Sequence, residues 1–306
     1  MKLNAVTAVI VTYDRLSLLK ACIAALRDQT CTPAAILVVN NASTDGTRAY
    51  LDILVSENPG WVQAVHLAEN TGGAGGFAEG LKRAMEHGAE WTWMMDDDAC
   101  PHMTALEELL KVERMPGNIY GSLAVNGKST SWPTTLLDQR KVVFFAEDMP
   151  AVALVESIPL LGFFIHRSLV EKIGYPDAGL FIAADDVEYC LRARRAGGDI
   201  VIAAKSRIEH PRTQVTEFRI FGLRIAYLSL PPWKRYYDTR NRFLIAKKYY
   251  GIRLYSQTIP GSFVRLFAAM LKEPNRFAQL QAFFAGFVDG MLNIRGKRHE
   301  YWKIRK

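Results

Sequence analysis

Apolar runs alternate with helical patterns along the first third of the chain. Four short runs predict buried β-strands, and a helical pattern such as residues 17–29 separates each run from the next. The strands are expected at residues 5–11, 35–39, 62–67 and 91–95. Because strands that alternate with helices form parallel sheets, the pattern predicts an α/β fold with a mostly parallel central sheet and helices on both faces.

The pattern becomes less regular after Pro101. Helices are expected at about residues 104–113 and 185–197, and a strand at residues 200–204 leads to His210. From about Pro231 onward, helical patterns rich in aromatic, Arg and Lys residues dominate. The sequence therefore predicts a first domain over residues 1–215 and a smaller helical C-terminal region over residues 216–306.

A polar segment follows each of the four expected strands directly. These segments are residues 12–15, 40–47, 69–77 and 96–101. In open parallel sheets, ligands bind outside the carboxyl ends of the strands. The four segments are therefore candidate parts of one site.

Charge is distributed unevenly along the 306 residues, whose net charge is +7. Residues 1–210 hold 19 Lys and Arg against 26 Asp and Glu, whereas residues 211–306 hold 19 against 5. A basic, aromatic-rich tail is typical of docking on an anionic surface, and membrane lipid is favoured over nucleic acid because no nucleic-acid-binding module is visible.

No apolar run reaches the length of about 18 residues that a membrane-spanning helix requires. The four cysteines show neither a disulfide framework nor zinc-site spacing, which favours a cytoplasmic protein.

Three consecutive aspartates, Asp96, Asp97 and Asp98, follow the fourth strand. Adjacent carboxylates repel one another unless a cation offsets their charge, and oxygen ligands favour Mg²⁺ or Mn²⁺ over zinc. Asp96 and Asp98, two positions apart, can aim at one point, which makes them candidate metal ligands. The alternative is a solvated acidic turn or a helix N-cap before Pro101.

A glycine-rich segment opens the third helical pattern. Gly73, Gly75 and Ala78 match a loose dinucleotide-binding fingerprint, and Asp96 follows about twenty positions later. Taken alone, this spacing favours an NAD-dependent oxidoreductase, although the fingerprint follows the third strand and not the first. Glycines also let the backbone approach a phosphate or sugar closely, and a purely structural glycine turn is a further alternative.

Together, four motifs resemble family 2 glycosyltransferases with the GT-A fold, a Rossmann-like α/β fold. The motifs are VIVTYDR, VVNNASTDGT, NTGGAGGFAEG and WMMDDDACP, and the resemblance covers about residues 5–211, roughly two thirds of the chain. The GGAGGF element is most similar to the galactofuranosyltransferase and rhamnosyltransferase branches. The segment PPWKRYYDTRNRFL resembles the Tyr-Tyr-x-x-Arg-Asn element that follows the catalytic domain in this branch.

The resemblance implies a role for each matching residue. The expected donor-binding residues are Thr12, Asp14, Arg15, Asn41, Asp45, Asn70, Gly73, Gly75, Gly76, Asp96 and Asp97, with Asn41 and Asp45 at the base or ribose and Asp97 beside the sugar. The expected metal ligands are Asp96, Asp98 and His210, although a lone histidine is more often a satisfied core or surface residue. Many relatives carry an acidic residue where this chain has Asn40 and Asn41, which leaves the base contact open.

Asp185 and Asp186 open the helical pattern at residues 185–197 and are similar to the family's acid-Asp-x-acid motif. A carboxylate that takes the proton from an acceptor hydroxyl speeds its attack on the anomeric carbon. The resemblance assigns this general base to Asp186 and a positioning role to Asp185. A doubled helix N-cap is the alternative.

The resemblance thus implies an inverting, Mn²⁺- or Mg²⁺-dependent hexosyltransferase that acts by direct displacement. UDP-galactofuranose is the favoured donor and dTDP-rhamnose the next. The expected acceptor is a lipid-linked glycan of a surface polysaccharide such as O-antigen, capsule or cell wall. The C-terminal region is expected to contact the acceptor and the inner face of the cytoplasmic membrane, or only to pack on the core. An NAD-dependent oxidoreductase and a non-catalytic, membrane-docked sugar-nucleotide-binding module remain the alternatives of other classes.

Overall fold

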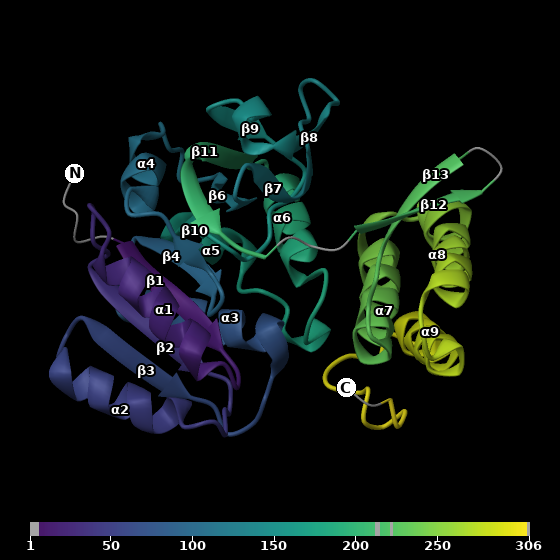
Figure 1. Ribbon diagram of the computed structural model, residues 1–306, viewed down its shortest axis with the longest axis horizontal. Coiled ribbons are helices and arrows are strands. Elements are labelled where there is room, and N and C mark those ends of the chain that lie inside the picture. The colour runs from purple at the N-terminus through teal and green to yellow at the C-terminus, as the bar shows by residue number, and fades with distance from the viewer. Residues whose placement is uncertain (1–5, 212–214, 221–222, 305–306) are drawn as a thin grey trace. The chain divides into compact units, whose positions relative to one another are not determined.

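The structure, a computed structural model, describes residues 6–211, 215–220 and 223–304 (Figure 1). The chain forms two compact units. The first comprises Met1–Pro176 and Asp186–Arg212, and the second comprises Asp177–Asp185 and Thr213–Lys306. The break between units after Arg212 lies close to the predicted boundary at residue 215, but the short segment Asp177–Asp185 belongs to the second unit.

The first half of unit 1 alternates strands and helices as the apolar pattern predicts. Its strands are β1 (Val6–Thr12), β2 (Ala35–Asn40), β3 (Val62–His66) and β4 (Trp91–Asp96), and its helices are α1 (Leu16–Arg27), α2 (Thr47–Glu57) and α3 (Gly72–Glu86). These four strands pair in parallel in the order β3-β2-β1-β4. The four expected strands are thereby confirmed, except that Ala5 lies outside the described residues.

The second half of unit 1 extends the same sheet with mixed pairing. Its elements are β5 (Cys100–Pro101), α4 (Ala105–Lys111), β6 (Ile119–Asn126), β7 (Ser129–Thr135), β8 (Val142–Phe145), η2 (Ala146–Asp148), β9 (Val152–Leu154), β10 (Phe163–His166), α5 (Arg167–Ile173), α6 (Asp185–Arg195) and β11 (Ile200–Glu209). Strand β10 pairs antiparallel with both β4 and β6, and β11 is parallel to β6. Because β10 is antiparallel to both of its neighbours, β6 runs in the same direction as β4, and therefore β6 and β11 run in the same direction as β1 and β4.

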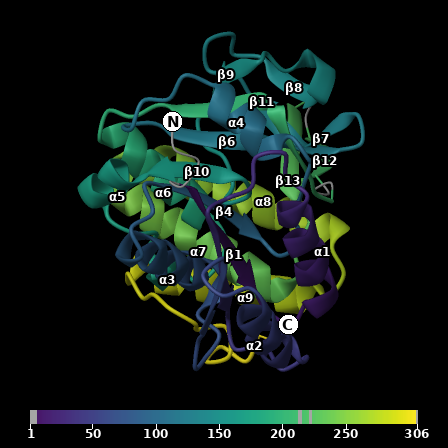
Figure 2. The same cartoon turned by 90° about the vertical axis from the view of Figure 1, so that its left-hand side faces the viewer.

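Helices cover both faces of the sheet because apolar side chains point to both sides of its strands. Val9 and Val11 belong to the apolar cluster that includes α3, whereas Ala8 and Ile10 belong to the cluster that includes α1. Figure 2 shows α1 and α3 on opposite sides of β1. The predicted α/β fold, with a mostly parallel sheet, is confirmed.

Unit 2 is mainly helical, as predicted from Pro231 onward. It contains η3 (Ala178–Leu180), the hairpin strands β12 (Val215–Ile220) and β13 (Leu223–Leu228), the helices α7 (Pro232–Tyr249), α8 (Ile259–Lys272) and α9 (Arg276–Met291), and a π-helical turn η4 (Leu254–Thr258). The hairpin is not foreseen by the sequence pattern. None of the helices within the described residues is long and apolar enough to cross a membrane.

Helices α7 and α9 approach each other closely because small residues line their contact. A Cβ atom added at Gly286 of α9 would lie 2.5 Å from the backbone oxygen of Tyr236. Buried polar groups also join these helices, since the Tyr236 hydroxyl donates to Asp289 at 2.5 Å. Helix α7 thus carries a buried polar face within unit 2.

Candidate active site

The carboxyl ends of β1, β4 and β11 meet at one edge of the sheet because these strands run in the same direction. Val11 of β1 is opposite Asp96 of β4. His210 follows the last residue of β11, and its backbone N–H donates to Val125 of β6. Segments that are about 80 to 200 positions apart in the chain therefore contribute to the same edge.

Asp97 is the buried member of the aspartate run. Its carboxylate accepts hydrogen bonds from the Thr12 hydroxyl at 2.7 Å and from Arg15 Nη1 at 3.2 Å. Burial raises the pKa of Asp97, and the hydrogen bonds from Thr12 and Arg15 offset this only in part. Asp97 therefore joins the ends of β1 and β4 and holds Arg15 in place.

Asp98 lies between Arg15 and His210. Its Oδ2 accepts a hydrogen bond from Arg15 Nη1 at 2.9 Å, and its Oδ1 is 3.8 Å from His210 Nε2. Asp98 Oδ1 and His210 Nδ1 are both buried without a hydrogen-bond partner. Asp98 Oδ1, a buried oxygen without a hydrogen-bond partner, lies near the ring nitrogen His210 Nε2. An oxygen and a nitrogen ligand in this arrangement suit a divalent cation.

The expected metal ligands do not form one cluster. Asp96 is the last residue of β4 and precedes the turn that carries Asp97 and Asp98. Within the described residues, no three His, Cys, Asp or Glu side chains lie close enough together to hold a metal ion by themselves. The structure therefore brings Asp98 and His210 together, whereas Asp96 does not complete a three-residue group with them.

Trp132 is a neighbour of His210 to which no sequence motif assigns a role. The two rings meet edge to face, with centroids 5.7 Å apart, and the Ser131 hydroxyl donates to the His210 backbone oxygen. The Trp132 ring therefore packs against the imidazole, and the Ser131 hydroxyl holds the backbone of His210.

The loops after β1 and β2 are tied together by predicted donor-binding residues. Asp14, at a φ of 51°, accepts hydrogen bonds from the backbone and hydroxyl of Thr44. Asp45 accepts from the Leu16 N–H and from Thr47. Burial acts to raise the pKa of Asp45, but these hydrogen bonds outweigh it and lower the pKa. Both carboxylates thus stabilise the loops.

Asn41 has a similar structural role. Its buried amide donates to the Gly72 carbonyl at 2.9 Å and accepts from the N–H and hydroxyl of Thr71. Asn70 accepts from the Gly72 N–H at 2.8 Å. These amides fix the entry into α3, and contact of either side chain with a nucleotide stays a prediction.

The glycine-rich segment is not a loop but the first turns of α3. A Cβ atom added at Gly75 would lie 2.4 Å from Thr71 Oγ1, and one added at Gly76 would lie 2.5 Å from Val11 Cγ1. Gly73 faces open space, with no neighbouring atom within 4 Å of an added Cβ. Gly75 and Gly76 allow close packing within the protein, and contact of Gly73, Gly75 or Gly76 with the donor stays a prediction.

Asp186 lies in the first turn of α6, where its Oδ1 accepts a hydrogen bond from the Val187 N–H at 2.7 Å. Burial raises the pKa of Asp186, and the backbone hydrogen bonds oppose this shift. Helix α6 is held in unit 1 by Tyr189, whose hydroxyl donates to the Gly174 carbonyl at 2.8 Å. Asp185, the preceding residue, is buried.

Two buried side chains of α7 hold the segment that precedes Asp185 in the chain. The Asn241 amide donates to the carbonyls of Leu180, Ile182 and Ala183 at 2.7–2.9 Å. Arg240 donates to the Leu180 carbonyl at 2.8 Å. The Tyr-Tyr-x-x-Arg-Asn element identified these residues of α7 in the sequence. The sequence did not show that Arg240 and Asn241 contact the segment before Asp185.

Comparisons with known proteins show to which family the chain belongs. Residues 7–174, more than half of the chain, match the family described as Glycosyl transferase family 2. Galactofuranosyltransferase GlfT1 of Mycolicibacterium smegmatis is 29% identical over 257 residues, which cover 78% of this chain and 81% of the relative. dTDP-rhamnosyl transferase RfbF of Shigella flexneri is 25% identical over 299 residues, which cover 94% of this chain and 96% of the relative.

A solved structure shows the same fold. The structure of GalNAc-T7 with UDP, GalNAc and Mn²⁺ superposes with a TM-score of 0.63 at 12% identity. The match covers 98% of this chain and 58% of GalNAc-T7, so this chain spans less than two thirds of the length of that protein.

The match to a transferase family also makes the oxidoreductase alternative wrong. The motifs, the GT-A-like fold and the family match together show that the chain belongs to Glycosyl transferase family 2.

Proposed function

We propose that this glycosyltransferase is a metal-dependent, inverting enzyme that transfers galactofuranose from UDP-galactofuranose to a lipid-linked glycan. The observation that carries metal dependence is the pair formed by Asp98 and His210, with Asp98 Oδ1 buried and free of hydrogen bonds 3.8 Å from His210 Nε2. The choice of galactofuranose as the transferred sugar rests on the relationship to GlfT1 over 78% of the chain and on the GGAGGF element.

Asp98 and His210 would hold Mn²⁺ or Mg²⁺, and oxygen atoms of the donor diphosphate would supply further ligands, because the described part of the chain places no third His, Cys, Asp or Glu beside them. The bound cation would offset the negative charge of the departing nucleoside diphosphate. Arg15, which contacts both Asp97 and Asp98, brings a positive charge to the same edge. Asp97, fixed by Thr12, keeps that guanidinium oriented.

Asp186 would act as the general base, with Asp185 positioning donor or acceptor. A carboxylate that takes a proton from a hydroxyl works better when its pKa is raised towards neutral pH. Burial raises the pKa of Asp186, which supports this role. Direct attack by the acceptor hydroxyl leads to inversion at the anomeric carbon.

An anionic membrane surface, on the cytoplasmic side, is the proposed place of action. Residues 211–306 hold 19 Lys and Arg against 5 Asp and Glu. Unit 2 also exposes large apolar side chains on α8 and α9, among them Phe263, Phe267, Leu271, Phe277 and Phe284. Basic and apolar side chains on the same helices are what an interfacial membrane contact requires.

dTDP-rhamnose is the second candidate donor. The relationship to RfbF covers 94% of this chain, which is more than the relationship to GlfT1 covers. The two donors share a diphosphate, so the Asp98–His210 pair does not distinguish them. The two donors differ in their sugar and in their nucleotide base, so contacts with these groups would decide between them.

A donor panel tests the proposal directly. The purified full chain is incubated with UDP-galactofuranose, dTDP-rhamnose or GDP-mannose, and release of the nucleoside diphosphate is measured with Mn²⁺ and with EDTA. We expect release from UDP-galactofuranose only, with loss in EDTA. Release that EDTA leaves unchanged would refute metal dependence, and release from dTDP-rhamnose alone would select the second candidate.

The same assay tests Asp98. Because metal stabilisation of the leaving group contributes several kcal/mol, Asp98→Asn should lower turnover about 100-fold or more. Asp148→Asn removes an exposed carboxylate of η2 and serves as the matched control, with turnover close to that of the unmodified chain. Equal turnover in the two variants would exclude Asp98 as a ligand.

A further inference from the structure

Arg15 places a positive charge directly against the candidate metal ligand Asp98. Its Nη1 lies 2.9 Å from Asp98 Oδ2 and 3.2 Å from Asp97 Oδ1, so one nitrogen contacts two carboxylates. Asp98 Oδ1, the other oxygen of the same group, is buried without a hydrogen-bond partner and lies 3.8 Å from His210 Nε2. The two oxygens of Asp98 thus have different neighbours, a guanidinium and an imidazole.

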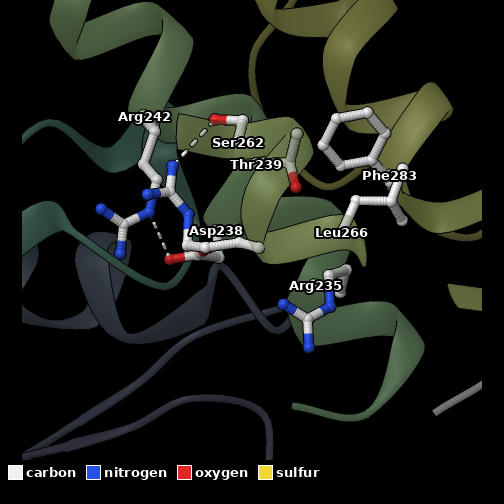
Figure 3. Close-up of a pocket in the computed structure, with 8 residues that line it drawn as sticks. Arg235, Asp238, Thr239, Arg242, Ser262, Leu266 and Phe283 are labelled. Atoms are coloured by element: carbon white, nitrogen blue, oxygen red, sulfur yellow. Dashed lines mark hydrogen bonds and ion pairs between the residues drawn. The ribbon is translucent and has the colours of Figure 1, made fainter. Parts of the chain in front are cut away.

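The contact between Arg15 and Asp98 differs from a local ion pair. Figure 3 shows a local pair in α7, where Arg242 Nε donates to Asp238, four positions earlier in the chain, at 2.9 Å. Such a pair forms within one helix and supports that helix. Arg15, in contrast, contacts carboxylates that follow it by 82 and 83 positions. Its partners are therefore set by the sheet and not by its own helix.

Asp97 has other partners besides Arg15. Its Oδ2 accepts hydrogen bonds from the Thr12 hydroxyl at 2.7 Å and from the Tyr13 N–H at 3.4 Å. The Arg15 side chain is 48% exposed, and ion pairs of exposed arginines contribute little to stability. Arg15 can therefore stay on Asp97 and exchange Asp98 for another anion without unfolding this edge of the sheet.

The position of Arg15 works against a cation at Asp98. The two oxygens of Asp98 share one carbon, so a divalent cation on Oδ1 would lie close to the guanidinium on Oδ2, and like charges at such a distance repel. Asp97, Asp98 and Arg15 together carry a formal charge of −1, whereas the two carboxylates alone carry −2. Arg15 thus weakens the attraction of this edge for a cation.

We propose that Arg15 makes cation binding at Asp98 and His210 depend on a nucleoside diphosphate. Without the nucleotide, Arg15 offsets part of the negative charge that attracts the cation. A diphosphate offers anionic oxygens to the cation and also to the guanidinium, whose planar fork matches phosphate oxygens. Cation and nucleotide then raise each other's affinity by the same factor. The inference rests on the proposed function in one respect, the cation site at Asp98 and His210.

Electron paramagnetic resonance of free Mn²⁺ tests the proposal without turnover. The full chain is titrated with Mn²⁺ alone and with Mn²⁺ in the presence of UDP, and a protein-free titration corrects for the Mn²⁺ that UDP holds in solution. We expect Mn²⁺ to bind the unmodified chain at least about tenfold more tightly with UDP. Equal affinities for Mn²⁺ with and without UDP would overturn the proposal.

Arg15→Gln should tighten the binding of Mn²⁺ alone about tenfold, because it removes a positive charge beside the cation. With UDP present the affinity for Mn²⁺ should change little, so the enhancement by UDP should shrink by a similar factor. An arginine that only held Asp98 in place would give the opposite result, weaker binding of Mn²⁺ alone. Unchanged or weaker binding in this variant therefore excludes the proposed role.

Two further variants show whether the charge of Arg15 is the cause. Arg15→Lys keeps the positive charge and should bind Mn²⁺ alone about as weakly as the unmodified chain. Arg242→Gln is the matched control, because it removes a guanidinium that is 39% exposed from another arginine–aspartate pair, and it should not alter Mn²⁺ binding. Tighter binding of Mn²⁺ alone in either variant would contradict the proposal.

Asp98→Asn separates this inference from the proposed function. The variant should lose Mn²⁺ binding both with and without UDP. Retained binding would mean that the cation site is wrong, and the role of Arg15 would be wrong with it. If instead Mn²⁺ and UDP bound together through Asp98 while Arg15→Gln bound Mn²⁺ alone no more tightly, only the role of Arg15 would be overturned.

Discussion

Consecutive aspartates in this chain occupy different environments. Asp97 is buried and satisfied by Thr12 and Arg15, whereas Asp98 keeps one carboxylate oxygen without a hydrogen bond. The sequence predicts that three adjacent carboxylates need a compensating cation. It could not predict that Arg15, 82 positions before Asp97, supplies part of that charge. The metal is therefore expected beside Asp98 and not at the centre of the run.

Asp186→Asn separates binding from catalysis. The amide keeps the size of the side chain but cannot take a proton, so donor binding should persist while turnover falls by about 100-fold or more. Donor binding is measured by calorimetry with Mn²⁺ and UDP, and turnover by UDP release in the presence of acceptor. A variant with near-normal turnover would exclude Asp186 as the base.

The pH profile of the unmodified enzyme gives a second test of Asp186. A base must be ionised, and because burial raises its pKa, Asp186 stays protonated to a higher pH than an ordinary aspartate, which titrates near ~4. Turnover should therefore fall as the pH is lowered, beginning well above pH ~4. If turnover stayed constant down to that pH while the protein remained folded, the proposed role would be wrong.

At the scale of single elements, α3 shows that the glycines of a recognisable motif also have a packing role. The pattern predicts that glycines bring backbone close to a ligand, and the structure shows that Gly76 and Gly80 bring α3 close to Val11 and Val9 of β1. Helix-to-strand distance depends on packing between segments far apart in the sequence. Spacing alone could therefore not distinguish the two uses of glycine.

Two matched substitutions in α3 test this packing role. An added Cβ at position 76 would lie 2.5 Å from Val11, so Gly76→Ala should lower the free energy of unfolding by about 1–3 kcal/mol. Gly73→Ala adds the same atom in open space within the same helix and should raise it by up to about 1 kcal/mol. Urea unfolding measures both, and equal effects would contradict the packing role.

The segment Asp177–Asp185 is a second element whose conformation depends on a distant part of the sequence. Phe181, Ala183 and Ala184 have φ values of 60–74°, which are unfavourable for residues other than glycine. Asn241 satisfies three carbonyls of this segment and Arg240 binds it as well. Because the segment leads directly into Asp185, we infer that α7 fixes the backbone that precedes the proposed base in the chain.

Asn241→Asp tests this connection. A carboxylate in place of the amide would face three carbonyl oxygens without a donor, so the free energy of unfolding should fall by about 2–4 kcal/mol. In the folded fraction, turnover should fall while the KM for donor is unchanged. Asn293→Asp changes an exposed residue of the same unit and is the control. Loss of stability with normal turnover would mean that α7 supports the segment without affecting the base.

At the scale of the whole molecule, the excess of positive charge lies in the C-terminal region, which also exposes large apolar side chains. If this region docks on a membrane, Phe277→Ser should weaken cosedimentation with anionic vesicles about tenfold, because Phe277 is 90% exposed on α9 and would be buried in the interface. Ile53→Ser removes a side chain of α2 that is 57% exposed and should have no effect. Equal binding of both variants would exclude α9 from the contact.

The sequence by itself determined the strands and helices of the first half, the polar segments at the strand ends and the helical C-terminal region. These features depend on local periodicity and on residue type, which the chain carries at each position. Only the tertiary structure decided that β10 enters the sheet antiparallel and that β11 returns parallel, which brings His210 beside Asp98. Strand order depends on which distant apolar faces bury one another, and the partners of each carboxylate follow from that order.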